Sequence, residues 1–152
     1  MPKRNRTVSK IVMTAFCLLV AAVAASCGPL GKDEKGKDAL TAAVEAFNRS
    51  FRWEDYNSAS AWVPPGKKEL FWKEVDNFKG KIRIIDFQVR EIDHIEKSTT
   101  ATAILHYQYY RPDSPTLETV TFSQKWFYVE KEKSWQVGQS GYQAITKRPT
   151  GL

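Results

Sequence analysis

An apolar stretch near the N-terminus constrains this 152-residue chain more than any other feature, because it determines where the remaining residues fold. Four basic residues and no acidic one precede it: Lys3, Arg4, Arg6 and Lys10. The apolar run covers residues 11–25, which suits the hydrophobic region of a secretory signal and falls short of the roughly 20 residues of a spanning helix. We predict that residues 1–26 are a signal peptide that is removed.

The apolar stretch ends in small residues and a cysteine: Ala24, Ala25, Ser26 and Cys27. This ending resembles the lipobox of bacterial lipoproteins, although that family favours Leu at the position of Ala24. The resemblance implies that the signal is cut before Cys27 and that Cys27 is acylated, with chains such as palmitate. The alternatives are an ordinary small-residue cleavage site with a chance cysteine behind it, or an apolar leader that is not removed.

A lipid on Cys27 would keep the mature protein on a membrane, since two or more acyl chains hold a protein essentially permanently. In lipoproteins, an Asp directly after the cysteine often retains the protein in the inner membrane, and this chain has Gly28 there. The resemblance therefore implies a lipid-anchored protein of the cell envelope, in the outer membrane and facing the periplasm. Residues 28–37 are mostly polar, and together with Cys27 they are expected to form a flexible tether.

Loss of the signal also changes the charge of the chain. Residues 1–26 hold four of the 23 basic residues and none of the 17 acidic ones, so the formal net charge falls from +6 to +2. A nucleic-acid partner is not expected, because it would need a basic face on the mature domain. Cys17 leaves with the signal and Cys27 would be acylated, so no disulfide can form. We also predict no cofactor.

Three helices are predicted in the first half of the mature chain. Asp38 is a suitable N-cap for the first helix, whose apolar residues recur at helical spacing along one stripe: Leu40, Ala43, Val44, Phe47 and Phe51. A shorter helix is predicted over residues 53–63 and a third over residues 67–78, with Pro64 and Pro65 between them.

Four strands are predicted after the helices, because β-branched and aromatic residues then occur in runs separated by turn signals. The predicted strands cover residues 82–96, 99–111, 116–130 and 135–145. The first strand is long enough that a bulge is expected. The second strand alternates between an apolar face with Leu105 and Tyr107 and a polar face with His106 and Gln108.

The predicted fold class is α+β, with three N-terminal helices packed on a curved four-stranded antiparallel sheet. This order of elements, together with the pattern K-x-W-x-V formed by Lys133, Trp135 and Val137, resembles the nuclear transport factor two-like (cystatin-like) superfamily. The resemblance implies one cone-shaped domain over residues 38–146, followed by a tail at 147–152. The alternative is a helix-on-sheet domain of another topology. Trp135 is expected to be buried, because it shares a strand face with Val137.

The sequence holds no catalytic, phosphate-binding or zinc-protease motif. The two histidines, His94 and His106, lie on neighbouring predicted strands. Pairing across the turn at residues 97–98 places His106 opposite residues 89–91, so about 10 to 17 Å separates the two rings along the sheet, too far to share a metal ion. No metal site is predicted, and both histidines are expected to be surface groups or to have hydrogen-bond partners.

Asp86 is the one acidic residue inside an apolar run. A buried carboxyl at this position would be a candidate general base. Asp86 has the same parity on the strand as Gln88 and Arg90, however, so it is expected to face water. No catalytic residue is therefore predicted.

Six aromatic residues are candidates for lining a pocket in the cone: Tyr56, Trp62, Tyr107, Tyr109, Trp126 and Tyr128. The alternative is that they form an ordinary core. Two functions remain open: a non-enzymatic envelope module that binds a small apolar ligand or a protein partner, and a small isomerase, dehydratase or hydrolase that uses the cone. We expect the binding module, because an enzyme needs a titratable group in the pocket and Asp86 is the only candidate.

Overall fold

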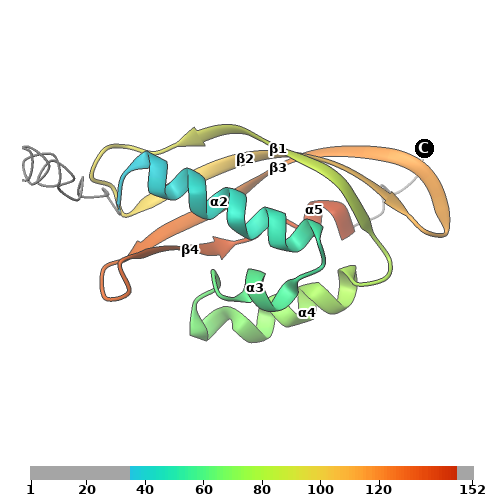
Figure 1. Cartoon of the computed structure of the whole chain (residues 1–152), viewed down its shortest axis with the longest axis horizontal. Coiled ribbons are helices and arrows are strands. Elements are labelled where there is room, and N and C mark those ends of the chain that lie inside the picture. Colours follow the sequence, from blue (N-terminus) through green and yellow to red (C-terminus); the bar gives the residue numbers. More distant parts are fainter. Residues whose placement is uncertain (1–34, 147–152) are drawn as a thin grey trace, which may run out of the picture. The chain divides into compact units, whose positions relative to one another are not determined.

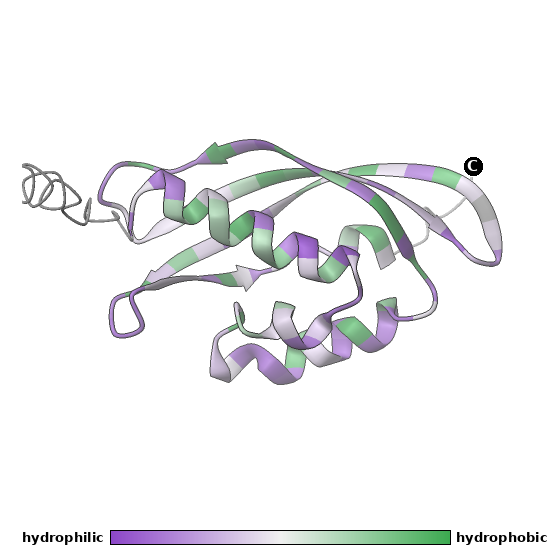
Figure 2. Ribbon diagram, viewed as in Figure 1, coloured by the Kyte–Doolittle hydropathy of each residue, from purple (hydrophilic) through white to green (hydrophobic). Residues whose placement is uncertain are grey.

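The computed structural model describes residues 35–146, and helix α2 (Lys37–Arg52) is the first element in this range (Figure 1). The predicted signal, Cys27 and the tail at 147–152 lie outside the described residues. The apolar stripe of α2 is buried as predicted, with Leu40, Val44 and Phe47 fully covered. Figure 2 shows this stripe as apolar bands that alternate with polar ones along the helix. The prediction that Asp38 caps the helix is wrong: Gly36 is the N-cap and Asp38 lies in the first turn, where its charge still favours the helix dipole.

The second predicted helix is shorter than expected. It comprises only α3 (Tyr56–Ser60), and a 3-10 turn, η2 (Pro65–Lys67), leads into α4 (Lys68–Phe78). The Asp55 side chain begins α3 by accepting a hydrogen bond from the Ser58 backbone N–H at 3.1 Å. Glu54, with φ at 58°, separates α3 from α2, which is why residues 53–55 do not continue a helix.

Four antiparallel strands form one sheet in the order β1-β2-β3-β4, which confirms the predicted α+β class. Their bounds are β1 (Arg83–Asp93), β2 (Thr100–Arg111), β3 (Ser114–Val129) and β4 (Ser134–Gln139). Helix α2 contacts both edge strands, β1 and β4, because the sheet curves around it (Figure 1). The faces of β2 alternate as predicted, with Leu105 and Tyr107 buried against the helices.

The bulge expected in the first strand is present twice. The pairing of β1 with β2 shifts register between Ile84 and Asp86 and again between Val89 and Glu91. The second shift moves the partner of His106 to Gln88, so the predicted pairing with residues 89–91 is wrong. Each bulge adds one residue to β1 and bends it, which helps the sheet to curve.

The predicted last strand, residues 135–145, is also wrong in its extent. β4 ends at Gln139, and a short helix, α5 (Gln143–Thr146), follows. Gly141 makes the turn with φ at +76°, and a Cβ there would lie 2.5 Å from both Phe122 Cδ2 and Ser123 O. Only glycine therefore fits this turn, which takes the chain off the sheet and places Tyr142 in the core with 1% of its surface exposed.

The domain begins slightly before the predicted boundary. Lys35 Nζ lies 2.7 Å from Glu130 Oε1 and 5.5 Å from the centre of the Tyr128 ring, and Lys37 begins α2, although we assigned both residues to the tether. Among the described residues, the buried core runs from Leu40 to Ile145, and β1 adds only partly buried side chains such as Ile84 and Phe87. Within residues 35–146, no helix is both long enough and apolar enough to cross a membrane.

Candidate functional site

The inside of the cone is filled by aromatic side chains. Helix α2 contributes Phe47 and Phe51, α4 contributes Phe71, and the segment after β4 contributes Tyr142. The rings of Phe51 and Tyr142 are stacked with centroids 3.9 Å apart, and Phe71 lies 6.2 Å from Phe51. These contacts occupy the space that a ligand inside the cone would need.

The six aromatic residues that we considered as pocket lining are distributed along the whole cone. Five of them are buried, and Trp62 is partly buried. Tyr56 packs edge-on against Phe51 at 5.1 Å, and Trp62 O accepts a hydrogen bond from Val137 N at 2.8 Å. At one end Tyr128 packs against Trp135, and at the other Tyr109 donates to Glu118 Oε2 at 3.0 Å. Only Tyr107 and Trp126 belong to one polar cluster.

This cluster lies at the centre of the cone and is formed by two amides, two phenols and an indole: Asn48, Gln124, Tyr107, Tyr142 and Trp126. The two amides face each other, with Asn48 Nδ2 donating to Gln124 Oε1 at 3.0 Å and Gln124 Nε2 donating to Asn48 Oδ1 at 2.9 Å. The hydroxyls of Tyr107 and Tyr142 both donate to Asn48 Oδ1. Trp126 Nε1 donates to Gln124 Oε1 at 3.3 Å. The members of the cluster therefore satisfy one another without a ligand.

The two phenols of the cluster are held in their neutral form. Burial raises the pKa of Tyr107 and of Tyr142 far above the usual value near 10, and the neighbouring Tyr107 raises that of Tyr142 further. Hydroxyls with such pKa values remain donors throughout the physiological range. The cluster thus supplies hydrogen bonds and no group that exchanges a proton near neutral pH.

The histidines lie apart from this cluster. His94 Nε2 is 3.3 Å from Ser98 O and its ring meets Trp135 edge-on at 5.3 Å, whereas His106 Nδ1 is 3.0 Å from Thr121 Oγ1. Among the described residues, no group of three or more His, Cys, Asp or Glu side chains is placed to hold a metal ion.

Asp86 also lies outside the cone, beside the first bulge of β1. Its Oδ1 accepts from Arg52 Nη1 at 3.1 Å, and 45% of its side chain is exposed. Asp86 pairs across the sheet with Gln108, on the face opposite to Tyr107 and Tyr109. This carboxylate therefore contacts solvent and an arginine from α2, and not the buried cluster.

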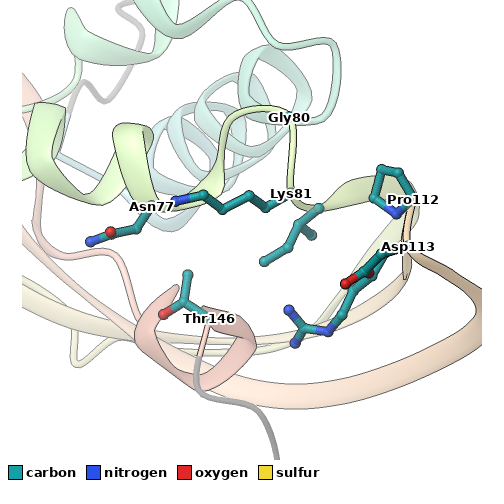
Figure 3. A pocket seen from close by; sticks show the side chains of 8 residues that line it. Asn77, Gly80, Lys81, Pro112, Asp113 and Thr146 are labelled. Atoms are coloured by element: carbon teal, nitrogen blue, oxygen red, sulfur yellow. The ribbon is translucent and has the colours of Figure 1, made fainter.

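A hollow of about 510 Å³ opens at the end of the cone, and Figure 3 shows the side chains around it. It lies where the α4–β1 loop, the β2–β3 turn and the end of α5 meet, and its labelled lining includes Asn77, Lys81, Asp113 and Thr146. Arg111 lines it too, with Nη2 donating to Ile145 O at 2.7 Å and Nε 3.3 Å from Glu118 Oε1. Its volume suits a small molecule with polar groups.

The solved structures that are similar to this domain include the two that follow. A ketosteroid isomerase-like protein from Erwinia carotovora atroseptica SCRI1043 matches with a TM-score of 0.54 at 12% identity, over 70% of this chain and 92% of that chain. An NTF-2-like protein of unknown function from Shewanella oneidensis MR-1 matches with a TM-score of 0.50 at 11% identity, over 66% and 92%. The domain has the nuclear transport factor two-like fold. At this level of identity the likeness shows the fold alone, and neither a family model nor a curated protein matches the sequence.

Three members of the cluster in this nuclear transport factor two-like domain were not predicted from the sequence: Asn48, Gln124 and Tyr142. A pattern in the sequence could have indicated the first two. Asn48 follows Val44 by four residues, so it lies on the apolar stripe of α2, where an amide is unusual. Gln124 shares its strand parity with Phe122 and Trp126 and therefore points inward. Tyr142 had no such signal, because we placed it in a strand that does not extend so far.

Proposed function

We propose that this protein is a bacterial envelope lipoprotein, anchored through a lipid on Cys27 in the outer membrane, and that its nuclear transport factor two-like domain is a non-catalytic binding module. The observation that supports a non-catalytic domain is the central cluster, whose amides and phenols pair with one another. Acid–base catalysis needs a group that changes protonation near the working pH, and the cluster contains none. A fold of this kind does not by itself decide between binding and catalysis.

The filled cone argues against an apolar ligand held inside it, which was one form of the binding hypothesis. The hollow at the end of the cone is a better place for a small ligand, because Lys81, Arg111 and Asn77 supply donors beside the apolar Ile82 and Pro112. A protein partner in the envelope would meet the same end of the domain. Amide chemical shifts in an NMR titration with candidate ligands would test this, and shifts confined to the central cluster would contradict it.

Replacing Cys27 with Ser is expected to release the protein from the membrane fraction or to leave it unprocessed. Serine lacks the thiol that the acyl group needs, and no helix among residues 35–146 is long and apolar enough to cross a membrane in its place. Fractionation followed by mass spectrometry of the N-terminus measures both results. A Cys27→Ser protein that is cleaved normally and stays on the membrane would overturn the anchor.

Replacing Asp86 with Asn is expected to lower the free energy of unfolding by less than about 1 kcal/mol, since partly exposed ion pairs contribute little. Arg52→Gln breaks the same pair and also the contact of Arg52 with the Trp53 ring, so it should cost as much as Asp86→Asn or slightly more in urea unfolding. The alternative function, a small isomerase, dehydratase or hydrolase, would need Asp86 to work as a base. A turnover assay in which the parent is active and Asp86→Asn is not would favour that alternative over the binding module.

A further inference from the structure

A second hollow lies at the tether end of the domain, opposite to the one described above. Its volume is about 460 Å³, and it is lined by three lysines with a glycine, a histidine and one carboxylate: Lys35, Lys37, Lys97, Gly36, His94 and Glu96. Lys35 also pairs with Glu130 at 2.7 Å, and the lining remains positive when this carboxylate is counted with Glu96. The chemistry of the hollow is that of a site for an anion.

An exposed apolar residue stands beside this hollow. Ile95 lies between two of the lining residues, His94 and Glu96, and 76% of its surface is exposed. Its backbone is fixed, because Ile95 O accepts from Ser98 N at 2.9 Å and closes the β1–β2 turn. The domain therefore presents a large apolar side chain next to a group of lysines, which is the combination that interfacial membrane segments use.

The chain between the anchor and the hollow is short. Cys27 and Lys35 are eight residues apart, so the chain can span at most about 29 Å between them. Figure 1 shows the start of α2 and the turn between β1 and β2 at the same end of the domain, and the turn between β2 and β3 at the other. An anchored Cys27 would keep the hollow and Ile95 within reach of the membrane surface.

We propose that this hollow binds the phosphate of a phospholipid headgroup in the membrane that carries the anchor, with Ile95 entering the interface beside it. The inference rests on the proposed lipid at Cys27, because the tether is what brings this end of the domain to the surface. Lysine ammonium groups are suited to phosphate as mobile point charges, and the lysines that line the hollow come from two segments, residues 35–37 and the β1–β2 turn. The other end of the domain, with the hollow around Lys81 and Arg111, would then face away from the membrane.

The test uses the mature chain, residues 27–152, with Cys27→Ser, so that binding to vesicles does not depend on acylation. Sedimentation with vesicles of phosphatidylglycerol and phosphatidylcholine, against phosphatidylcholine alone, is expected to show a preference for the anionic vesicles. The double variant Lys37→Gln and Lys97→Gln should weaken that binding by about fivefold for each lysine, or about 25-fold in all. Ile95→Ser should weaken binding to both kinds of vesicle by about fivefold.

The matched control is Lys73→Gln with Lys79→Gln, which removes the same charge from exposed positions that line no part of the hollow. It should change binding by less than about twofold, because interactions beyond the Debye length are screened. Equal losses in the two double variants, or no preference for anionic vesicles, would overturn the headgroup site. Inorganic phosphate alone is the last probe. If it shifts the NMR signals of Gly36 and Lys97 and binds as tightly as the vesicles do, the headgroup site is also overturned, in favour of a site for a free anion.

The two proposals fail in different ways. A protein that leaves the membrane on Cys27→Ser replacement, but whose mature chain shows no preference for phosphatidylglycerol, keeps the anchor and loses the headgroup site. A Cys27→Ser protein that remains processed and membrane-bound even when Lys37 and Lys97 are also replaced by Gln contradicts the anchor itself. The melting curve of each variant is compared with that of the parent. Where the two curves match, weaker binding is not caused by unfolding of the variant.

Discussion

Replacing Trp135 with Ala is expected to lower the free energy of unfolding by about 3–5 kcal/mol, a large part of the 5–15 kcal/mol that is usual for a domain. Trp135 lies on β4 with 2% of its surface exposed, as the sequence analysis predicted. Its ring packs edge-on against Tyr128 at 5.6 Å and against His94 at 5.3 Å. Alanine would leave a cavity between two hairpins that these rings hold together.

Urea unfolding followed by circular dichroism measures this loss, and two variants make it interpretable. Trp53 is 70% exposed and contacts Arg52, so Trp53→Ala should cost less than about 1 kcal/mol. Trp135→Phe should cost less than Trp135→Ala, because Trp135 Nε1 has no hydrogen-bond partner among the described residues and its removal leaves no group unpaired. A Trp135→Ala protein within about 1 kcal/mol of the parent would show that β4 is not packed as described.

Replacing Asn48 with Leu is expected to lower the free energy of unfolding by about 2–4 kcal/mol, although leucine is the more apolar residue and similar in size. Asn48 is fully buried, and its Oδ1 accepts from Gln124 at 2.9 Å, from Tyr142 at 3.1 Å and from Tyr107. Each donor left unpaired at this depth costs about 1–3 kcal/mol. The hydroxyls of Tyr107 and Tyr142, 3.3 Å apart, can still pair with each other and reduce the total.

A double-mutant cycle with Gln124→Leu separates the cost of an unpaired group from the cost of a changed shape. The double variant leaves fewer unpaired groups than the two single replacements do together, because Gln124 Nε2, which Asn48→Leu leaves unpaired, is then removed as well. The double variant should therefore be more stable than the sum of the single losses predicts. Urea unfolding of the four proteins measures the coupling. An Asn48→Leu protein at least as stable as the parent would mean that the cluster does not hold the cone together, and would weaken the case that it is structural.

Tyr142 is the residue that closes the cone. Its ring stacks on Phe51 at 3.9 Å and on Phe47 at 5.9 Å, and its hydroxyl joins the cluster at Asn48. The turn at Gly141 places the Tyr142 side chain in the core. The path of the chain after β4 therefore determines whether this part of the cone is filled or open.

The sequence by itself determined the elements whose periodicity is strong. The stripe from Leu40 to Phe51 predicted α2, the alternation around Tyr107 predicted β2, and the order of helices before strands predicted the α+β class. These signals are local, since a helix or strand that buries one face must repeat apolar residues with its own period. Trp135 was placed correctly by the same parity argument.

Only the tertiary structure decided the end of β4, the pairing of His106 and the closure of the cone. Gly141 reads in sequence as an ordinary strand or turn glycine, and only the nearness of Phe122 and Ser123 shows why the chain leaves the sheet there. The register at His106 depends on a bulge that alternation along one strand does not reveal. Asn48 and Gln124 are 76 residues apart, and their pairing follows from the packing of α2 on β3, which no local pattern encodes.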